Sequence, residues 1–242
     1  MSRAKLQDFL VPVALLVIGT ALIAITGLDI RIESSFYRNG VWIGKDLNPW
    51  RFLYRHGVAP AYICAGVALA ILAGGYLKAN LALYRKRALF VVLLLVIGPG
   101  LLVNTVFKDH WGRPRPTQLQ IFNGKEMASY HQVWERGESG TGHSFPSGHS
   151  SAAFYLMFPY FLLRRRSPAK ARLALAGGIG YGLFMGVARM AQGGHFPSDV
   201  LWAGGIVYLT GVALYHLLGM DEDAVPVPSG SADLAAGEAS AD

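Results

Sequence analysis

Three short clusters hold the side chains of this chain that are suited to binding and transferring a phosphoryl group. They are Lys108 with Arg115-Pro116, the tetrapeptide Pro146-Ser147-Gly148-His149, and Arg189 with His195 and Asp199. Together they supply three permanent cations, two imidazoles, a carboxylate and a glycine-containing turn. Arg and Lys bind phosphate oxygens, and an imidazole serves as a nucleophile or a proton donor near neutral pH. The residue types therefore predict phosphoryl chemistry.

The first cluster offers a point charge at Lys108 and, seven residues later, the planar fork of Arg115, which grips two phosphate oxygens. Arg113-Pro114 comes directly before Arg115-Pro116, so two Arg-Pro registers compete for this role. A basic helix end at a membrane surface is the plainer interpretation of this cluster taken alone.

The second cluster precedes an apolar run and has the features of a helix start. Gly148 lets a ligand approach the backbone, the free N–H groups of a first helical turn bind anions, and Ser147 adds a hydroxyl donor. His149 can supply a proton near neutral pH. The alternative interpretation is an ordinary N-cap.

The third cluster spaces His195 four residues before Asp199 and six residues after Arg189. A carboxylate at Asp199 could hold one imidazole nitrogen and leave the other free to attack a phosphorus atom. Ser198 and Asp199 also suit the start of the helix that follows, and this capping role is compatible with the first.

Long apolar runs determine the expected fold class. The chain is 52% hydrophobic and 15% charged, whereas soluble domains carry about 25% charged residues. Since a membrane span needs about 20 apolar residues, we predict an all-α, polytopic membrane bundle of six transmembrane helices. They occupy residues 9–28, 58–77, 88–107, 150–163, 173–188 and 200–220. A signal peptide is the alternative for the first run, but no A-x-A cleavage site follows it.

Charge distribution predicts how the bundle is inserted. The 22 Lys and Arg residues divide equally between the two sides of the six spans, but one set is concentrated in short connectors such as 85–87 and 164–166. Short basic connectors stay in the cytoplasm, so we expect both chain ends inside and the three clusters outside, on the periplasmic face of a bacterial inner membrane. The basic runs suit anionic lipid rather than nucleic acid, and no obligate protein partner is evident.

Two further segments have distinct compositions. Residues 29–57 mix six Trp, Tyr and Phe side chains with basic residues, which suits either interfacial anchoring or a gate for an anionic headgroup. Residues 221–242 begin with three acidic residues and continue with Pro, Ser, Gly and Ala, which predicts a disordered cytoplasmic tail after a domain of residues 1–220. The single cysteine, Cys64, excludes an intrachain disulfide.

Taken together, the order and spacing of the three clusters resemble the type 2 phosphatidic acid phosphatase superfamily. Its pattern of Lys-x6-Arg-Pro, Pro-Ser-Gly-His and Ser-Arg-x5-His-x3-Asp fits this chain between residues 88 and 220, except that Ala188 replaces the serine. The resemblance implies a six-helix phosphatase and haloperoxidase-like core. It also implies a reaction without metal or cofactor, and the fixed cations could supply the electrostatic stabilisation that Mg²⁺ supplies elsewhere.

The same resemblance implies a role for each residue. His195 becomes the nucleophile that forms phosphohistidine, Asp199 orients it, and His149 protonates the leaving oxygen. The phosphoryl group is held by Lys108, Arg115, Ser147, Gly148 and Arg189.

We therefore expect a membrane lipid phosphatase. Its candidate substrates are lipid A phosphates, undecaprenyl diphosphate, phosphatidylglycerol phosphate and phosphatidic acid, and the stretch from Trp111 to Pro116 resembles lipid A phosphatases. Two alternatives are a vanadium haloperoxidase-like oxidase and a transporter with charged helix ends. Six apolar spans disfavour the first, and the clustering of charge at helix ends disfavours the second.

Overall fold

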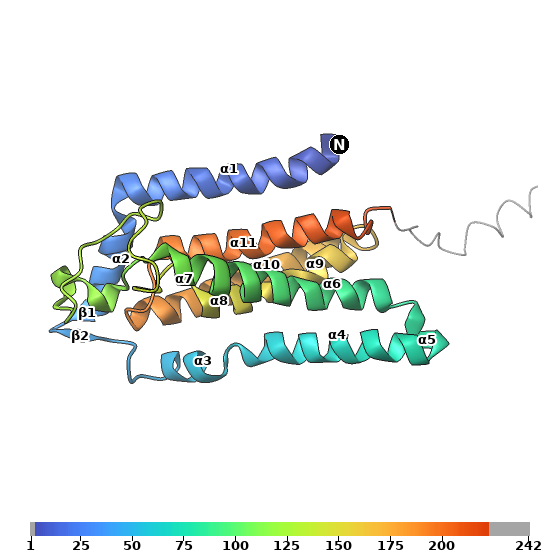
Figure 1. The fold of residues 1–242 in the computed structure, drawn as a ribbon, viewed down its shortest axis with the longest axis horizontal. Helices are drawn as coiled ribbons and strands as arrows, with labels where there is room; N and C mark the ends of the chain where they lie inside the picture. Colours follow the sequence, from blue (N-terminus) through green and yellow to red (C-terminus); the bar gives the residue numbers. More distant parts are fainter. Residues whose placement is uncertain (1–2, 223–242) are drawn as a thin grey trace, which may run out of the picture.

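The computed structural model describes residues 3–222, which form a bundle of long helices lying side by side (Figure 1). Five helical segments within this range are long and apolar enough to cross a membrane. These segments are Lys5–Thr26, Trp50–Leu77, Arg85–Gln118, Pro168–Ala191 and Pro197–Leu217. The predicted helical class is confirmed, whereas the count of six spans is not.

The long helices and the short elements between them follow in a simple order. The N-terminal half contains α1 (Arg3–Thr26), α2 (Leu28–Phe36), α3 (Trp50–His56), α4 (Ala59–Leu77), α5 (Ala79–Ala82) and α6 (Arg85–Leu95). The π-helix η1 (Val96–Phe107), α7 (Lys108–Trp111) and the 3₁₀ turns η2 (Pro116–Gln118) and η3 (Gln120–Phe122) follow. The chain then forms α8 (Gly148–Phe154), the 3₁₀ turn η4 (Tyr155–Met157), α9 (Phe158–Leu163), α10 (Pro168–Ala191) and α11 (Pro197–Leu217).

The fourth predicted span is the segment that departs from a regular helix. Its residues are divided among α8, η4 and α9, which run consecutively from Gly148 to Leu163. Pro159 lies in the first turn of α9, and a proline ring clashes with the carbonyl four residues earlier. The helix therefore tightens into a 3₁₀ turn before Pro159, and this segment is shorter than the five long ones.

The third span contains a π-helix around a proline. Pro99 has no N–H to donate and lies between Gly98 and Gly100, which are poor helix formers. The backbone from Val96 to Phe107 adopts the wider π geometry, which occurs most often near functional sites. The Asn104 amide donates to the Pro99 carbonyl at 2.7 Å, so the side chain satisfies a carbonyl inside this segment.

Residues 29–57 are more structured than the loop that their composition suggested. They contain most of α2, the antiparallel hairpin of β1 (Tyr37–Arg38) and β2 (Val41–Trp42), and α3. Asn39-Gly40 forms the hairpin turn, and both residues have positive φ, as a type I′ turn requires. Tyr37, Trp42 and Phe122 pack ring against ring and attach the hairpin to the segment after α7.

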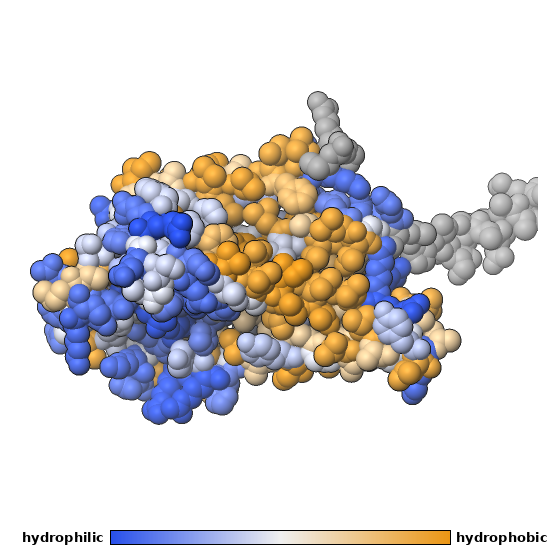
Figure 2. Space-filling view, in the orientation of Figure 1, coloured by the Kyte–Doolittle hydropathy of each residue, from blue (hydrophilic) through white to orange (hydrophobic). Residues whose placement is uncertain are grey.

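On the face shown in Figure 2, two hydrophilic ends flank a broad apolar surface. At one end the Arg164 guanidinium and the His216 imidazole contact the Asp8 carboxylate at 2.8 and 3.0 Å, and Lys5 pairs with Asp221 at 2.8 Å. These contacts bring the first helix and residue 221 together. The predicted tail therefore has an ordered beginning, and its remainder, residues 223–242, lies outside the described residues.

Candidate active site

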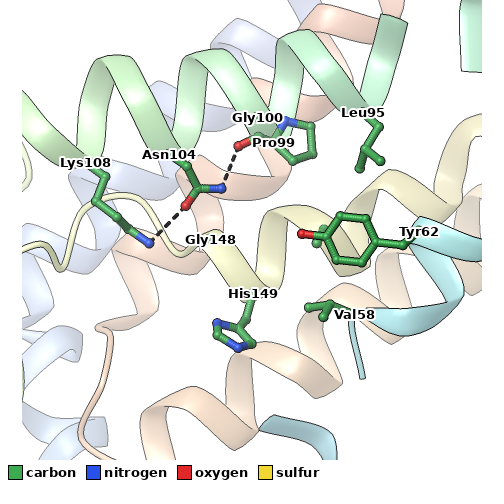
Figure 3. Close-up of a pocket in the computed structure, with 10 residues that line it drawn as sticks. Val58, Tyr62, Leu95, Pro99, Gly100, Asn104, Lys108, Gly148 and His149 are labelled. Atoms are coloured by element: carbon green, nitrogen blue, oxygen red, sulfur yellow. Dashed lines mark hydrogen bonds between the residues drawn. The ribbon is translucent and has the colours of Figure 1, made fainter. Parts of the chain in front are cut away.

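A cavity of about 370 Å³ opens at the opposite end of the bundle, between α4, η1 and α8. Its polar wall is formed by Lys108, Gly148 and His149. Its apolar wall includes Val58 and Tyr62, and Figure 3 shows both walls facing the same space. A ligand with a charged head and an apolar body matches this division.

Three cations without neutralising partners act on the polar end of this cavity, since Lys108 lines it and Arg115 and Arg189 lower the pKa of its His149. Within residues 3–222, Lys108, Arg115 and Arg189 form no ion pair with a carboxylate, and the Nε atoms of both arginines are buried without a hydrogen-bond partner. Buried cations are normally paired. An anion is therefore the group that this site is built to receive.

Gly148 allows Lys108 to approach the backbone closely. A methyl group at its position would lie 2.7 Å from the Lys108 ammonium and 2.5 Å from the Asn104 side-chain oxygen. The Lys108 ammonium in turn donates to that oxygen at 3.2 Å (Figure 3). The helix start and Lys108 thus occupy space that only glycine leaves open.

Ser147 has the capping role that the sequence offered as the plainer interpretation. It is the N-cap of α8, and its buried hydroxyl donates to the Ser150 hydroxyl at 2.8 Å and accepts from the Ser150 amide at 3.4 Å. The helix therefore begins at Gly148, with its free N–H groups beside Lys108.

Both imidazoles of the site experience the same three cations. Burial, followed by Arg189, Lys108 and Arg115, lowers the pKa of His195 well below its usual range. Burial, followed by Arg189 and Lys108, lowers the pKa of His149 to about 4. Both rings are therefore neutral at neutral pH, and the shared cations place both rings around one site.

His195 is held by a backbone carbonyl. Its Nδ1 lies 2.6 Å from the Ser144 oxygen, and because a carbonyl can only accept, Nδ1 carries the proton. The other ring nitrogen, Nε2, then has a free lone pair. The buried ring is thus fixed in the tautomer that a nucleophile needs.

Asp199 does not form the direct hydrogen bond to His195 that the spacing suggested. Its Oδ2 lies 3.8 Å from Nδ1, because the carboxylate is occupied by the Ser144 hydroxyl at 2.6 Å, the Phe196 amide at 2.8 Å and Arg113 at 2.5 Å. The Phe196 contact confirms the capping role at the start of α11. Asp199 thus acts on His195 through space and through Ser144, whose hydroxyl it holds.

Arg113 resolves the competition between the two Arg-Pro registers. It is fully buried, and its guanidinium bridges Asp199 and Asp29, contacting the latter at 2.8 Å. Ser198 donates its amide and hydroxyl to Asp29 at 2.9 and 2.6 Å. Arg113 therefore stabilises the fold behind the site, and Arg115 remains available to an anion. Sequence reasoning missed Asp29, for which a carboxylate directly after an apolar span was the available signal.

Ala188, which departs from the family pattern, lies in an apolar environment. Its buried methyl group packs with Leu53, Ala153 and Met185 between α3, α8 and α10. Arg189 follows in the last turn of α10, where the predicted fifth span continues into the motif. The residue that replaces the serine therefore contributes to the packing beneath Arg189.

Glu33 is a second acidic residue that the motifs did not indicate. Its side chain on α2 is completely buried, and neither carboxyl oxygen has a hydrogen-bond partner among the described residues. Burial, followed by Asp199 and Asp29, raises its pKa well above the usual range. Burial and the neighbouring carboxylates therefore favour the neutral, protonated form of Glu33. Within residues 3–222, no group of three or more His, Cys, Asp or Glu side chains is arranged to hold a metal ion.

Comparison with known proteins gives consistent matches. Residues 87–222 match the PAP2 superfamily. A lipid A 4'-phosphatase of Francisella tularensis subsp. novicida (strain U112) is 35% identical over 196 residues, which cover 79% of this chain and 86% of that protein. Phosphatidylglycerophosphatase B of Bacillus subtilis (strain 168) is 31% identical over 150 residues, which cover 60% of this chain and 64% of that protein.

A solved structure has the same fold. It is the crystal structure of a transmembrane PAP2 type phosphatidylglycerolphosphate phosphatase from Bacillus subtilis, with a TM-score of 0.50. The match covers 89% of this chain and 96% of that chain at 24% sequence identity, so the likeness concerns the fold alone.

Proposed function

This chain belongs to the PAP2 superfamily and is a membrane phosphatase of lipid phosphates, and we propose that it acts through a phosphohistidine intermediate on His195. The observation that carries the mechanism is the group of three cations without counterions around two neutral imidazoles. The named relatives favour a phosphatase over the alternatives of an oxidase or a transporter.

In the first step, Nε2 of His195 attacks the phosphorus atom and the bond to the lipid oxygen breaks. The proton stays on Nδ1 and is donated to the Ser144 carbonyl, so the phosphorylated ring carries a positive charge. Asp199 stabilises this charge from 3.8 Å. Lys108, Arg115 and Arg189 balance the charge on the phosphoryl oxygens, with the Gly148 amide as a further donor. The Ser147 hydroxyl joins them by turning from Ser150 to the phosphoryl group.

His149 donates the proton that the leaving oxygen takes up. Its pKa is low because of burial and, after that, the nearby cations, and a bound phosphate dianion offsets the effect of the cations and raises that pKa. The protonated ring releases the lipid as an alcohol. His149 then accepts a proton from the water that attacks phosphohistidine, which regenerates His195 and releases phosphate.

The reaction proposed here needs no metal ion. Three fixed cations supply the charge that a metal supplies in other phosphoryl-transfer enzymes. Phosphate release in the presence of excess EDTA tests this. Full inactivation that Mg²⁺ or Zn²⁺ reverses would contradict it.

For the substrate we propose a lipid A 4'-phosphate. The relative from Francisella, which matches most of both chains, is named for this activity. The apolar wall beside the polar end of the cavity suits an acylated sugar phosphate. Phosphatidylglycerol phosphate is the second candidate, because the Bacillus relative acts on it by name. Phosphate release from purified lipid A, phosphatidylglycerol phosphate, phosphatidic acid and undecaprenyl diphosphate in detergent distinguishes them by kcat/KM.

We propose that the site faces the periplasm from the inner membrane, with both chain ends inside. Basic connectors around 85–87 and 164–166 support this orientation. The test places single cysteines at Lys125 and Ala169 in a Cys64→Ala background. A membrane-impermeant thiol reagent should label the first position in intact spheroplasts and miss the second. The reverse pattern would overturn the orientation, and labelling of both would contradict the six-span count.

A further inference from the structure

The short helix α3 lies against the active site, although it precedes the segment that matches the family. Its Leu53 is buried in the cluster of Ala153, Met185 and Ala188, and the Tyr181 hydroxyl donates to the Gly57 carbonyl at 2.7 Å. One side of α3 is therefore attached to α8 and α10, which carry His149 and Arg189.

The ring of Tyr54 on this helix contacts two residues of the site. It stacks on the His149 imidazole with ring centroids 4.8 Å apart and an angle of 21° between the planes. The Arg189 guanidinium carbon lies 4.7 Å from the same ring centroid, a cation–π contact. The aromatic ring thus bounds the space in which each group can turn.

A second link runs from α3 to Arg189. The Arg189 guanidinium donates to the Gln192 side-chain oxygen, and the Gln192 amide donates to the Trp50 carbonyl at 3.2 Å. Arg189 is therefore oriented from α3 by both Tyr54 and Trp50. A group without a counterion needs such support, because its own charge is repelled by neighbouring cations.

We propose that Tyr54 is a positioning residue of the active site, which holds the imidazole of His149 and the guanidinium of Arg189 in the arrangement that phosphoryl transfer requires. The proposal rests on the proposed function of these two residues. The side chain acts through the face of its ring, since no hydrogen bond joins the Tyr54 hydroxyl to another described residue. A hydrogen bond between His149 and the Tyr54 backbone is independent of the side chain and remains available to every Tyr54 variant. It also explains why aromatic residues in this segment do more than anchor the chain at the membrane surface.

The kinetic test compares Tyr54→Ala with Tyr54→Phe. Alanine removes the ring, so we expect kcat for lipid phosphate to fall about 10–100-fold with KM within about threefold, since misplacement near 1 Å has this effect on rate. Phenylalanine keeps the ring and should retain at least about half of kcat. Phe52→Ala is the matched control, because its ring is 59% exposed on the same helix and contacts His56 rather than the site.

A second measurement does not depend on turnover. Protein in detergent micelles with isotope-labelled histidine reports the titration of His149, assigned with His149→Gln. Burial is the largest cause of its low pKa, so Tyr54→Ala should raise that pKa by about one pH unit or more, whereas Tyr54→Phe should not. Thermal unfolding in the same detergent shows that each variant is folded.

The outcomes are separable. A folded Tyr54→Ala variant with wild-type kcat and an unshifted His149 titration would overturn the proposal. Equal loss of kcat in Tyr54→Phe would overturn it too, and equal loss in Phe52→Ala would assign the effect to membrane anchoring. If the wild-type protein released no phosphate from any lipid, the proposed function would fail, and the titration would still test whether Tyr54 orders His149.

Discussion

Replacing Gly148 with alanine should separate activity from stability in this protein. The added methyl group would lie 2.5 Å from the Asn104 oxygen and 2.7 Å from the Lys108 ammonium, whereas ordinary contact begins at 3.4 Å. These two side chains must therefore withdraw by roughly 0.7–0.9 Å, and both ends are flexible. The backbone can stay in place, since Gly148 is a helical residue with no positive φ.

The expected size of the effect follows from this displacement. Misplacing a catalytic or binding group by about 1 Å reduces a rate by about 10²-fold, which corresponds to about 2.7 kcal/mol. The methyl group also covers the helix N–H groups that would meet the phosphate. Stability should change in the opposite direction, because alanine is a better helix former than glycine by up to about 1 kcal/mol. We therefore expect kcat/KM to fall about 100-fold with an unchanged or higher unfolding temperature.

The assay measures phosphate release from lipid A in detergent, together with inhibition by vanadate and thermal unfolding of the same samples. Gly180→Ala in α10 is the matched control, since its added methyl group meets no atom within 4 Å. That variant should keep wild-type activity. Gly148→Ala with activity within about threefold of wild type would refute the claim that Lys108 and the helix start form the phosphate site. An activity loss explained by unfolding would refute the expected separation of activity from stability.

Three further predictions concern other groups of the site. His195→Ala should lower kcat at least about 10³-fold while the unfolding temperature stays near wild type, because it removes the nucleophile. Near wild-type phosphate release would show that another group attacks the phosphorus atom. Vanadate should inhibit at low concentration, because its adduct mimics the transition state at the same cations. Inhibition should weaken in Arg115→Ala, and an equal inhibition constant in both proteins would show that Arg115 does not bind the phosphoryl group. Glu33 has a raised pKa in the folded state, so the free energy of unfolding falls as pH rises above 4.5, the value in an unfolded chain. Glu33→Gln lacks this dependence. If the melting temperatures of the two proteins changed equally with pH from 5 to 8, the raised pKa of Glu33 would be contradicted.

The sequence alone determined the helical class and identified the three clusters from which the candidate site is built. Long apolar runs leave few alternatives to membrane helices, because backbone groups in a bilayer must be satisfied within the helix. The start of α8 at Gly148 and the disturbance of the helix around Pro99 were also predictable, since caps, glycine and proline act on their immediate neighbours.

The six-span count stays a prediction, because local patterns alone do not decide it. The segment from Gly148 to Leu163 is helical throughout, but Pro159 and a 3₁₀ turn divide it, and its apolar length is less than that of the five long segments. Composition identifies an apolar segment, whereas the neighbouring helices decide whether a short, irregular one lies inside the bundle.

Only the tertiary structure assigned partners within the site. Arg113 and Arg115 have the same local sequence, and the choice between them depends on Asp29, which is 84 residues away in the chain. His195 donates its hydrogen bond to the Ser144 carbonyl rather than to Asp199, because Arg113 and the Ser144 hydroxyl already donate to that carboxylate. Tyr54 reaches His149 across nearly a hundred residues. Such contacts depend on how whole helices pack and rotate against one another, which no local spacing encodes.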